Sequence, residues 1–363
     1  MADTLTRRQV LDLRVHAQQL GRAAGVLAAT AVLDLGVQDT GPDGGLWALA
    51  LRGVDTAALD GEALATVWTV RGAPHLYRRA DLPGVAAATA PFSDADAGKR
   101  IFDAAKPLKA AGIGNLEALD AVAAAMRSVV TAPMVKGEMS GRLTALMPEP
   151  YLRLCRPCDA THIHEQPFRL AALRAGLELE PGTSPPVLRP VPGLAPAATV
   201  PPHLDVVRGY LRLLGPATPK LVAGYLDAPV KDVQARWPED AVEVTVDGER
   251  RWLLAEDADR VDEVPPAAGV FLLGPFDLFL QARDRPILVD DPARAKALWP
   301  VLGRPGAVLA DGEVAGTWRP RKAGSSLTVA VTLWAPVPRD ALTEAAERLA
   351  AFRGVVLKDV HTD

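Results

Sequence analysis

One short segment near the N-terminus combines three side chains that could do chemistry together. Gln38-Asp39-Thr40 places an amide, a carboxylate and a hydroxyl side by side, directly after the apolar run 31–37. These groups can hold and polarise a water molecule. They also suit a turn or a helix cap, because Asp and Thr side chains bond nearby backbone groups and a Gly-Pro pair follows. The segment by itself leaves both interpretations open, with capping favoured.

The densest polar cluster is His162-Ile163-His164-Glu165-Gln166. If this segment is a strand, His162 and His164 project from one face and Glu165 from the other. A solvated strand face explains the pattern without a function. A strand that faces nucleic acid would use the two histidines as donors to phosphates or base edges.

Cys155-Arg156-Pro157-Cys158 has the spacing of a redox dithiol, or of half a zinc site completed by His162 and His164. The βαβ unit of a thioredoxin is not evident around it, and a His-x-His pair so close to the second cysteine is tight for a metal. We therefore favour a structural role and predict no metal and no cofactor. Two cysteines in the whole chain fit a reducing compartment.

Common enzyme signatures are missing from the sequence. No Gly-x-Gly-x-x-Gly follows a strand, and neither a phosphate-binding Gly-x-x-x-x-Gly-Lys-Ser/Thr loop nor a Gly-x-Ser-x-Gly elbow occurs. Nucleotide-driven and serine-hydrolase functions are therefore disfavoured.

Length and charge set further bounds. The chain has 363 residues, enough for two or three domains, and a net charge of −4. The charge is segregated: residues 99–156 carry a net +4, residues 231–263 a net −6 and residues 283–322 a net +3. This pattern is compatible with one anion-facing surface. No apolar run is long enough for a membrane span or a signal peptide, so we expect a cytoplasmic protein associated with the nucleoid.

The elements that must position these residues follow a repeated order. We expect helices at 6–24, with Thr6 as N-cap, at 26–35 and at 46–52, then strands at 66–70 and 75–78. Three short helices followed by a hairpin is the order of a winged helix. A second, less clear unit has helices at 116–130 and 136–146 and a strand pair near 160–168. A Pro-rich linker is expected over 181–202.

The third unit and the C-terminal part are clearer. Helices are expected at 203–214, at 220–226 with Thr218 as cap, and at 230–237, before a hairpin over 242–254 with an Asp-Gly turn. Strands then follow at 270–273, 287–289, 307–310, 314–319 and 327–333. The amphipathic pattern of 339–352 predicts a final helix with Leu342, Ala345, Ala346 and Leu349 facing inward.

Six segments in this order resemble the bacterial winged-helix DNA glycosylases, which excise bulky alkylated purines and in some cases protect antibiotic producers from their own DNA-alkylating products. The segments are Gln38–Thr40, Leu46–Arg52, Trp68–Leu76, Gly215–Pro219, Leu272–Arg285 and Val314–Arg319. The resemblance covers nearly the whole chain. It implies an α+β, mostly helical fold with three tandem winged-helix units and a small C-terminal β-barrel-like domain around a DNA channel. We accordingly assign winged helices to 1–92, 93–182 and 203–266, a linker to 183–202, and the β-domain with its terminal helix to 267–363.

The resemblance also implies site residues. The family carries a Gln-x-Gln or Gln-x-Asp catalytic motif, to which Gln38 corresponds, but here the third position is Thr40 and the carboxylate lies at Asp39. Either Asp39 activates water from a shifted position, Thr40 does so weakly, or the chain does less chemistry than its relatives. The Arg-Gly-x-x-His ribbon corresponds to Arg71 and His75, which the resemblance places along the DNA channel. The alternative is that Arg71 contacts a phosphate from the hairpin and His75 packs within its strand. The residues expected to contact DNA are Arg71, His75, His162, His164, Arg283, Arg285, Arg319, Arg321 and Lys322.

Two functions compete at this point. The first is a monofunctional, monomeric DNA glycosylase that acts on double-stranded DNA with bulky N7- or N3-alkylpurine adducts. The alternative is a non-catalytic winged-helix DNA-binding protein such as a transcriptional regulator. The altered motif favours the regulator, and the absence of an evident effector or dimerisation segment disfavours it.

Overall fold

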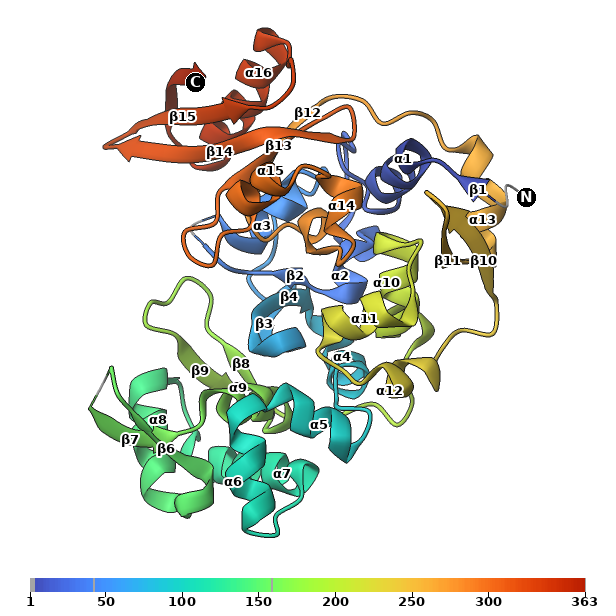
Figure 1. Cartoon of the computed structure of the whole chain (residues 1–363). Coiled ribbons are helices and arrows are strands. Elements are labelled where there is room, and N and C mark those ends of the chain that lie inside the picture. The colour runs from blue at the N-terminus through green and yellow to red at the C-terminus, as the bar shows by residue number, and fades with distance from the viewer. Residues whose placement is uncertain (1–3, 42, 158, 363) are drawn as a thin grey trace. The chain divides into compact units, whose positions relative to one another are not determined.

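The chain folds into an α+β structure in which helical residues outnumber strand residues, as expected. The computed structural model (Figure 1) describes residues 4–41, 43–157 and 159–362, without the side chains of residues 322 and 323. Backbone contacts divide the chain into two compact units. Unit 1 comprises Met1–Leu59, Arg208–Leu221 and Pro238–Asp363, and unit 2 comprises Asp60–Val207 and Val222–Trp237. Within the described residues, no helix has the length and apolar character needed to cross a membrane.

The N-terminal helices of unit 1 are shorter than the sequence predicts. Helix α1 (Arg7–Ala17) begins at the expected cap, where Thr6 Oγ1 accepts a bond from Gln9 N at 3.2 Å. It ends near Gln19, whose φ of 57° lies in the left-handed region, so the prediction of one helix over 6–24 was wrong. The expected helix 26–35 is also broken, into a 3₁₀ turn at Leu27–Ala29 and helix α2 (Val32–Leu35). Gly36, at φ 89°, ends α2 as expected.

A two-residue strand and a short helix then carry the polar segment. Strand β2 (Val37–Gln38) leads into helix α3 (Gly44–Ala50), close to the expected 46–52. Trp47 on α3 is buried, and its Nε1 donates to Leu272 O at 2.8 Å. Helix α3 is therefore anchored to the C-terminal sheet of the same unit.

The hairpin expected over 242–254 is confirmed. Strands β10 (Ala241–Val246) and β11 (Glu249–Leu254) pair antiparallel, and β1 (Thr4–Leu5) adds to β10 in parallel. Asp247 and Gly248 both have positive φ, 49° and 80°, as the tightest hairpin turns require. Helix α13 (Ala255–Arg260) follows the hairpin.

The preceding helices also match the prediction. They are α10 (Val206–Leu214), α11 (Pro219–Leu226) and α12 (Val230–Gln234), and the unit boundaries fall within α10 and α11 and after α12. Thr218 caps α11, because Leu221 N donates to Thr218 Oγ1 at 3.3 Å.

The C-terminal part of unit 1 is one five-stranded sheet covered by a helix (Figure 1). The strand order is β12 (Val270–Leu273), β13 (Gly306–Ala310), β14 (Glu313–Ala323), β15 (Ser326–Leu333) and β16 (Val356–Thr362). Helix α16 (Arg339–Phe352) has the predicted bounds and buries the predicted face of Leu342, Ala345, Ala346 and Leu349. Strand β16 was not predicted.

One predicted strand of this region is a helix. Residues 287–289 belong to helix α14 (Arg285–Leu288) and its C-cap, and helix α15 (Pro292–Leu298) follows. A short apolar run cannot be assigned to strand or helix by its periodicity, and Pro286 at the first turn favours the helix.

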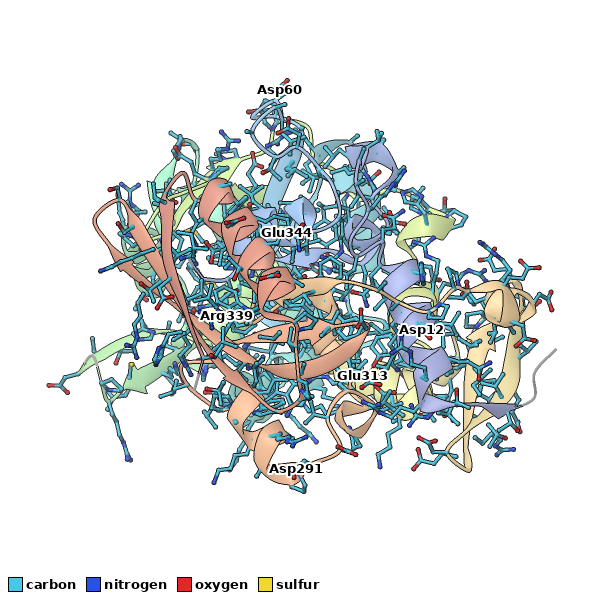
Figure 2. The ribbon with its side chains drawn as sticks, turned by 90° about the horizontal axis from the view of Figure 1, so that it is seen from above. Asp12, Asp60, Asp291, Glu313, Arg339 and Glu344 are labelled. Atoms are coloured by element: carbon cyan, nitrogen blue, oxygen red, sulfur yellow. The ribbon has the colours of Figure 1, made fainter. Side chains whose placement is uncertain are left out.

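One ion pair and a backbone hydrogen bond attach α1 to the C-terminal part of unit 1. Asp12 Oδ1 accepts a bond from Ala267 N at 2.7 Å and also pairs with Arg8 at 2.9 Å. Arg7 pairs with Glu313 at the start of β14, at 2.7 Å. Figure 2 labels Asp12 and Glu313 among the side chains of this region.

Unit 2 packs helices against a sheet in which β4, β3, β8, β9 and β5 lie side by side. Its strands are β3 (Leu64–Trp68), β4 (Pro74–Arg78), β5 (Met134–Val135), β8 (Leu177–Leu179) and β9 (Val187–Pro190). Its helices are α4 (Leu82–Ala88), α5 (Asp94–Arg100), α6 (Ala105–Ala110), α7 (Asn115–Val129), α8 (Lys136–Leu146) and α9 (Glu165–Arg174). The core of unit 2 lies between α7, α9 and β3, where the Trp68 and Phe168 ring centroids are 5.8 Å apart.

Two predictions for unit 2 were wrong in part. The strand pair near 160–168 consists of β6 (Leu152–Cys155) and β7 (Ala160–Ile163), and the chain from Glu165 onward is helix α9. The Pro-rich stretch 181–202 contains β9, which pairs with both β8 and β5. Only the parts of that stretch outside β9 have the irregular backbone expected of a linker.

Candidate functional site

Gln38 and Thr40 are brought together at the end of β2. Gln38 Nε2 donates a hydrogen bond to Thr40 Oγ1 at 3.1 Å, and both side chains are half-buried. The bond orients the Gln38 amide and leaves its carbonyl oxygen at the other end of the group. The Thr40 hydroxyl, which accepts this bond, still has its own proton to donate, and the Gln38 carbonyl oxygen remains an acceptor, so the pair offers both kinds of group to a water molecule.

Asp39 caps helix α3. Asp39 Oδ1 accepts a hydrogen bond from Gly45 N at 2.8 Å. A Cβ built on Gly44 would lie 2.0 Å from the same oxygen, so only glycine allows this approach, and its φ of 49° also favours glycine. The capping role considered for this segment is therefore realised by Asp39.

A small hollow of about 20 Å³ lies beside Gln38 and Thr40. One wall is the start of α3 with Asp43, and the other is the loop Gly274-Pro275-Phe276-Asp277 that follows β12. Asp43 is paired with Arg353 at the end of α16, whose Nε donates to Asp43 Oδ1 at 2.6 Å. This carboxylate is thus neutralised by a cation.

A buried ion pair holds the second wall of the hollow. Arg52 donates from Nη1 and Nη2 to the two oxygens of Asp277, at 2.9 and 3.0 Å, and both side chains are fully buried. Arg52 also donates to the Ala48 carbonyl, and Asp277 Oδ1 accepts from Phe279 N at 3.0 Å. The network satisfies the buried charges and fixes the loop relative to α3.

The strand before this loop is fixed by two indole groups. Trp47 donates to the carbonyl of Leu272, and Trp318 Nε1 on β14 donates to the carbonyl of Leu273, each at 2.8 Å. Gly306 makes room for the second bond, because a Cβ there would lie 2.2 Å from Trp318 Nε1. The backbone leading to Gly274 is therefore rigidly placed.

In unit 2, Arg71 and His75 lie on one tight connection but in different environments. Arg71 has a φ of 59°, donates from Nη1 to Tyr225 O at 2.6 Å, and lies over the Tyr225 ring at 4.8 Å. His75 is buried, with Nδ1 3.0 Å from Thr69 Oγ1 and 2.9 Å from Ala73 O. Burial, together with the Arg71 charge, lowers the pKa of His75 to about 3. His75 is thus a neutral, packed residue, and the expectation that it lines a DNA surface is corrected.

The two histidines of the polar cluster do not share a strand face. His162 lies on β7, half-buried, with Nδ1 3.1 Å from the Ile163 carbonyl. His164 is the N-cap residue of α9 and is buried, and burial lowers its pKa. Glu165 begins the helix, so the alternation expected of a strand does not apply. His164, like His75, is not at the surface that a DNA contact requires.

The basic residues expected to contact DNA from the β-domain lie in unit 1. Arg319 and Arg321 are exposed on β14, while Arg283 and Arg285 are half-buried. Arg285 lies over the Trp299 ring at 4.7 Å, and burial lowers the pKa of Arg285. The side chain of Lys322 lies outside those that the structure describes.

The cysteine pair is only partly described. Cys155 ends β6 opposite Ala160, and Cys158 lies outside the described residues. Within the chain that is described, no group of three His, Cys, Asp or Glu side chains is arranged to hold a metal ion.

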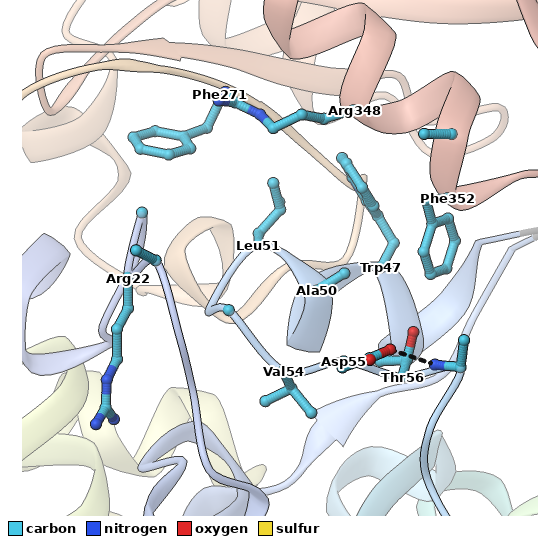
Figure 3. A pocket seen from close by; sticks show the side chains of 15 residues that line it. Arg22, Trp47, Ala50, Leu51, Val54, Asp55, Thr56, Phe271, Arg348 and Phe352 are labelled. Carbon is cyan, nitrogen blue, oxygen red and sulfur yellow. Dashed lines mark hydrogen bonds between the residues drawn. The ribbon is translucent and has the colours of Figure 1, made fainter.

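A cavity of about 630 Å³ in unit 1 was not foreseen from the sequence (Figure 3). The rings of Trp47, Phe271 and Phe352 line it, with Arg22 and Arg348 among the other residues. The Trp47 and Phe352 ring centroids are 5.1 Å apart. Trp47 and Ala50 face this cavity from α3, whereas Gly44 and Ala48 face the hollow at Gln38, so the two spaces adjoin different sides of one helix.

Comparison with known proteins defines the class. A model described as DNA glycosylase AlkZ-like matches residues 32–352, and the chain therefore belongs to the AlkZ-like DNA glycosylase family. It is a DNA-binding hydrolase of N-glycosyl bonds that acts in DNA repair. The resemblance seen in the sequence is thereby confirmed, and the enzyme is favoured over the regulator.

Among solved structures, the chain is similar to the Streptomyces sahachiroi DNA glycosylase AlkZ. The TM-score is 0.74 at 22% sequence identity, over 99% of this chain and 100% of that chain. At this identity the likeness shows the shared fold. The comparison with curated proteins found no match.

Sequence reasoning missed the residues that surround the candidate site. The Gly274–Asp277 loop was part of the resemblance but had no assigned role, and Asp43, Arg52 and Arg353 were not considered. Two signals were present: Arg52 ends an apolar helix, and Asp277 interrupts an apolar segment. Charged residues in such positions are buried only when paired, but the sequence does not say with which partner.

Proposed function

We propose that this enzyme hydrolyses the N-glycosidic bond of N7- or N3-alkylated purines, bulky adducts included, in double-stranded DNA. Gln38 and Thr40 hold the attacking water, and Asp39 positions helix α3 beside them. The observation that carries the proposal is the Gln38 Nε2–Thr40 Oγ1 hydrogen bond of 3.1 Å at the edge of the hollow. In the resemblance, these positions correspond to the first and third residues of the catalytic motif.

The chemistry suits a site of this kind. A purine alkylated at N7 or N3 carries a positive charge and leaves readily, so a strong general acid is not required. The enzyme has to place water near the anomeric carbon and stabilise an oxocarbenium-like sugar. Placement alone can lower a barrier by ~7–11 kcal/mol, and the Gln38 carbonyl dipole adds electrostatic stabilisation.

The carboxylates nearest to the hollow support a role for the neutral groups. Asp43 is neutralised by Arg353 and Asp277 by Arg52. Asp39 instead caps α3 through its Oδ1. The proposal therefore assigns water binding to Gln38 and Thr40 and leaves Asp39 two separable roles, as a cap and as a nearby negative charge.

The winged-helix units and the β-domain are the parts of the chain that we expect to bind the duplex. Three winged-helix units at 1–92, 93–182 and 203–266, joined to the β-domain 267–363 by way of 183–202, form a monomer. The β3–β4 and β10–β11 hairpins support two of the wings. Arg71, His162, Arg283, Arg285, Arg319, Arg321 and Lys322 would contact phosphates, which position a duplex without specifying its sequence.

The test compares four proteins on a duplex that contains one N7-alkylated guanine, with abasic sites measured after alkaline cleavage. We expect Gln38→Ala to lose about 10²-fold or more in kcat. Thr40→Val is expected to lose about tenfold, and Thr40→Ser to stay within a few-fold of the wild type. Duplex binding by all four should stay within a few-fold. Wild-type kcat in Gln38→Ala, or no excision by the wild type on any alkylated purine, would overturn the proposal.

A further inference from the structure

Two adjacent apolar side chains of unit 1 project almost fully into solvent. Val301 is 97% exposed and Leu302 86%, which makes them the most exposed large apolar residues in the described part of the chain. Single exposed apolar residues are common, but two large neighbours at a loop tip form a contiguous apolar projection. They lie in the segment 299–305 between α15 and β13.

This tip is held by contacts on both sides. Before it, Trp299 is buried, with Arg285 4.7 Å over its ring. After it, Gly303 accepts a bond from Arg319 Nη2 at 2.6 Å, and Arg304 lies 5.1 Å over the Phe276 ring. Pro300 and Pro305 restrict the backbone on each side of the tip. The apolar projection therefore has a defined base.

The same contacts place the tip near the candidate site. Phe276 lines the hollow beside Gln38 and Thr40. Leu302 lies two residues before Arg304, so their Cα atoms are separated by at most about 7 Å. Both the tip and the hollow belong to unit 1.

The surroundings of the tip are cationic. Asp291 caps α15 and is labelled in Figure 2. From there to Asp311 the chain carries Arg294, Lys296 and Arg304 and no acidic residue. Arg285 and Arg319 add two further charges from neighbouring segments. An apolar tip with arginines at its base is complementary to the base steps and phosphates of DNA.

We propose that Val301 and Leu302 form a wedge that inserts between base pairs of the duplex next to the damaged nucleotide. The wedge separates one stacked step while the surrounding arginines contact the phosphates. This rests on the proposed function, because it places the wedge beside the Gln38–Thr40 site. It also specifies the substrate as duplex DNA, since only paired and stacked bases require such opening.

The test measures the unstacking of a base directly, by a signal that does not depend on excision. A duplex carries 2-aminopurine next to one N7-alkylated guanine, and its fluorescence rises when the base beside it is unstacked. We expect the rise with the wild type and with Gln38→Ala, and its loss in the double variant Val301→Ser/Leu302→Ser. The double variant should lose at least tenfold in kcat/KM on this duplex. On a second duplex, in which mismatches leave the bases around the adduct unpaired, no stacked step has to be opened, and the double variant should stay within about twofold of the wild type. Leu302→Met, which keeps an apolar tip, should retain the fluorescence change.

Val356→Ser is the matched control, because Val356 is 70% exposed in the same unit but lies on β16 outside the wedge. It should behave as the wild type in both assays, and all variants should keep the wild-type Tm. Wild-type fluorescence and kcat/KM on the first duplex in the double variant would overturn the wedge, as would an equal loss on both duplexes. If Gln38→Ala loses excision but still unstacks the neighbouring base, the role of the wedge is independent of the role of Gln38 in hydrolysis.

Discussion

At Asp39 the capping role and the charge can be separated by substitution. Asn keeps the side-chain oxygen that accepts from Gly45 N but removes the charge, and Ala removes both. If the cap is the main role, Asp39→Asn keeps kcat within a few-fold, while Asp39→Ala loses about 0.5–2 kcal/mol of unfolding free energy. Denaturant titration and single-turnover excision measure the two effects. A large loss of kcat in Asp39→Asn at unchanged stability would instead assign the water-activating role to the carboxylate.

His75 makes the stability of unit 2 depend on pH. In the unfolded chain its pKa is near 6.5, and in the fold it is about 3, so the folded state binds this proton less readily. The His75 contribution is complete above pH 6.5 and is lost as the pH falls from 6.5 toward 3. The unfolding free energy should decrease there by up to about 1.4 kcal/mol per pH unit.

Equilibrium denaturation between pH 4 and pH 8 measures this slope. His75→Gln should remove most of it, at some cost in stability from the altered contact with Thr69. An identical slope in His75→Gln would contradict the assignment.

Among the elements, the loop after β12 depends most on one buried ion pair. Asp277→Asn leaves the Arg52 guanidinium buried without its counter-charge and should cost about 3–5 kcal/mol of unfolding free energy. The double variant Arg52→Met/Asp277→Leu should recover much of this loss, since it removes both charges. Urea denaturation measures each variant.

The control for this pair is Glu344→Gln, which breaks the exposed contact with Arg348 (Glu344 is labelled in Figure 2) and should cost about 1 kcal/mol or less. If Asp277→Asn proved as mild as this control, the buried pair would not be what holds the loop. A recovered double variant with low kcat would show that loop placement, beyond stability, matters for excision.

For the whole molecule, DNA affinity should depend on salt through the exposed arginines. Arg321 is exposed on β14, and Arg321→Ala should lower the slope of log Kd against log salt by about 1 while weakening all duplexes equally. His164→Gln should not change the slope, because His164 is buried. Fluorescence anisotropy between 50 and 300 mM salt measures both (roughly the range over which such slopes are resolved). An unchanged slope in Arg321→Ala would remove this residue from the interface.

Local patterns in the sequence determined much of the secondary structure. Thr6 and Thr218 were identified as caps, Asp247-Gly248 as a hairpin turn and 339–352 as a helix, and each is confirmed. These features depend on interactions between residues close together in the chain, so they can be predicted from the sequence. The strand predicted at 287–289 was wrong because three apolar residues after a proline fit either a strand or a helix until their neighbours are known.

The sequence alone also determined the class of the protein, through ordered segments spread over the chain. Only the tertiary structure decided what surrounds Gln38 and Thr40. Arg52 and Asp277 are 225 positions apart, as are Trp47 and Leu272, and no periodicity links such residues. The burial of His75 and His164, which removes both from the surface, likewise depends on the tertiary structure. A charge or a ring nitrogen acquires its role from the dielectric and the partners around it, and chain packing supplies both.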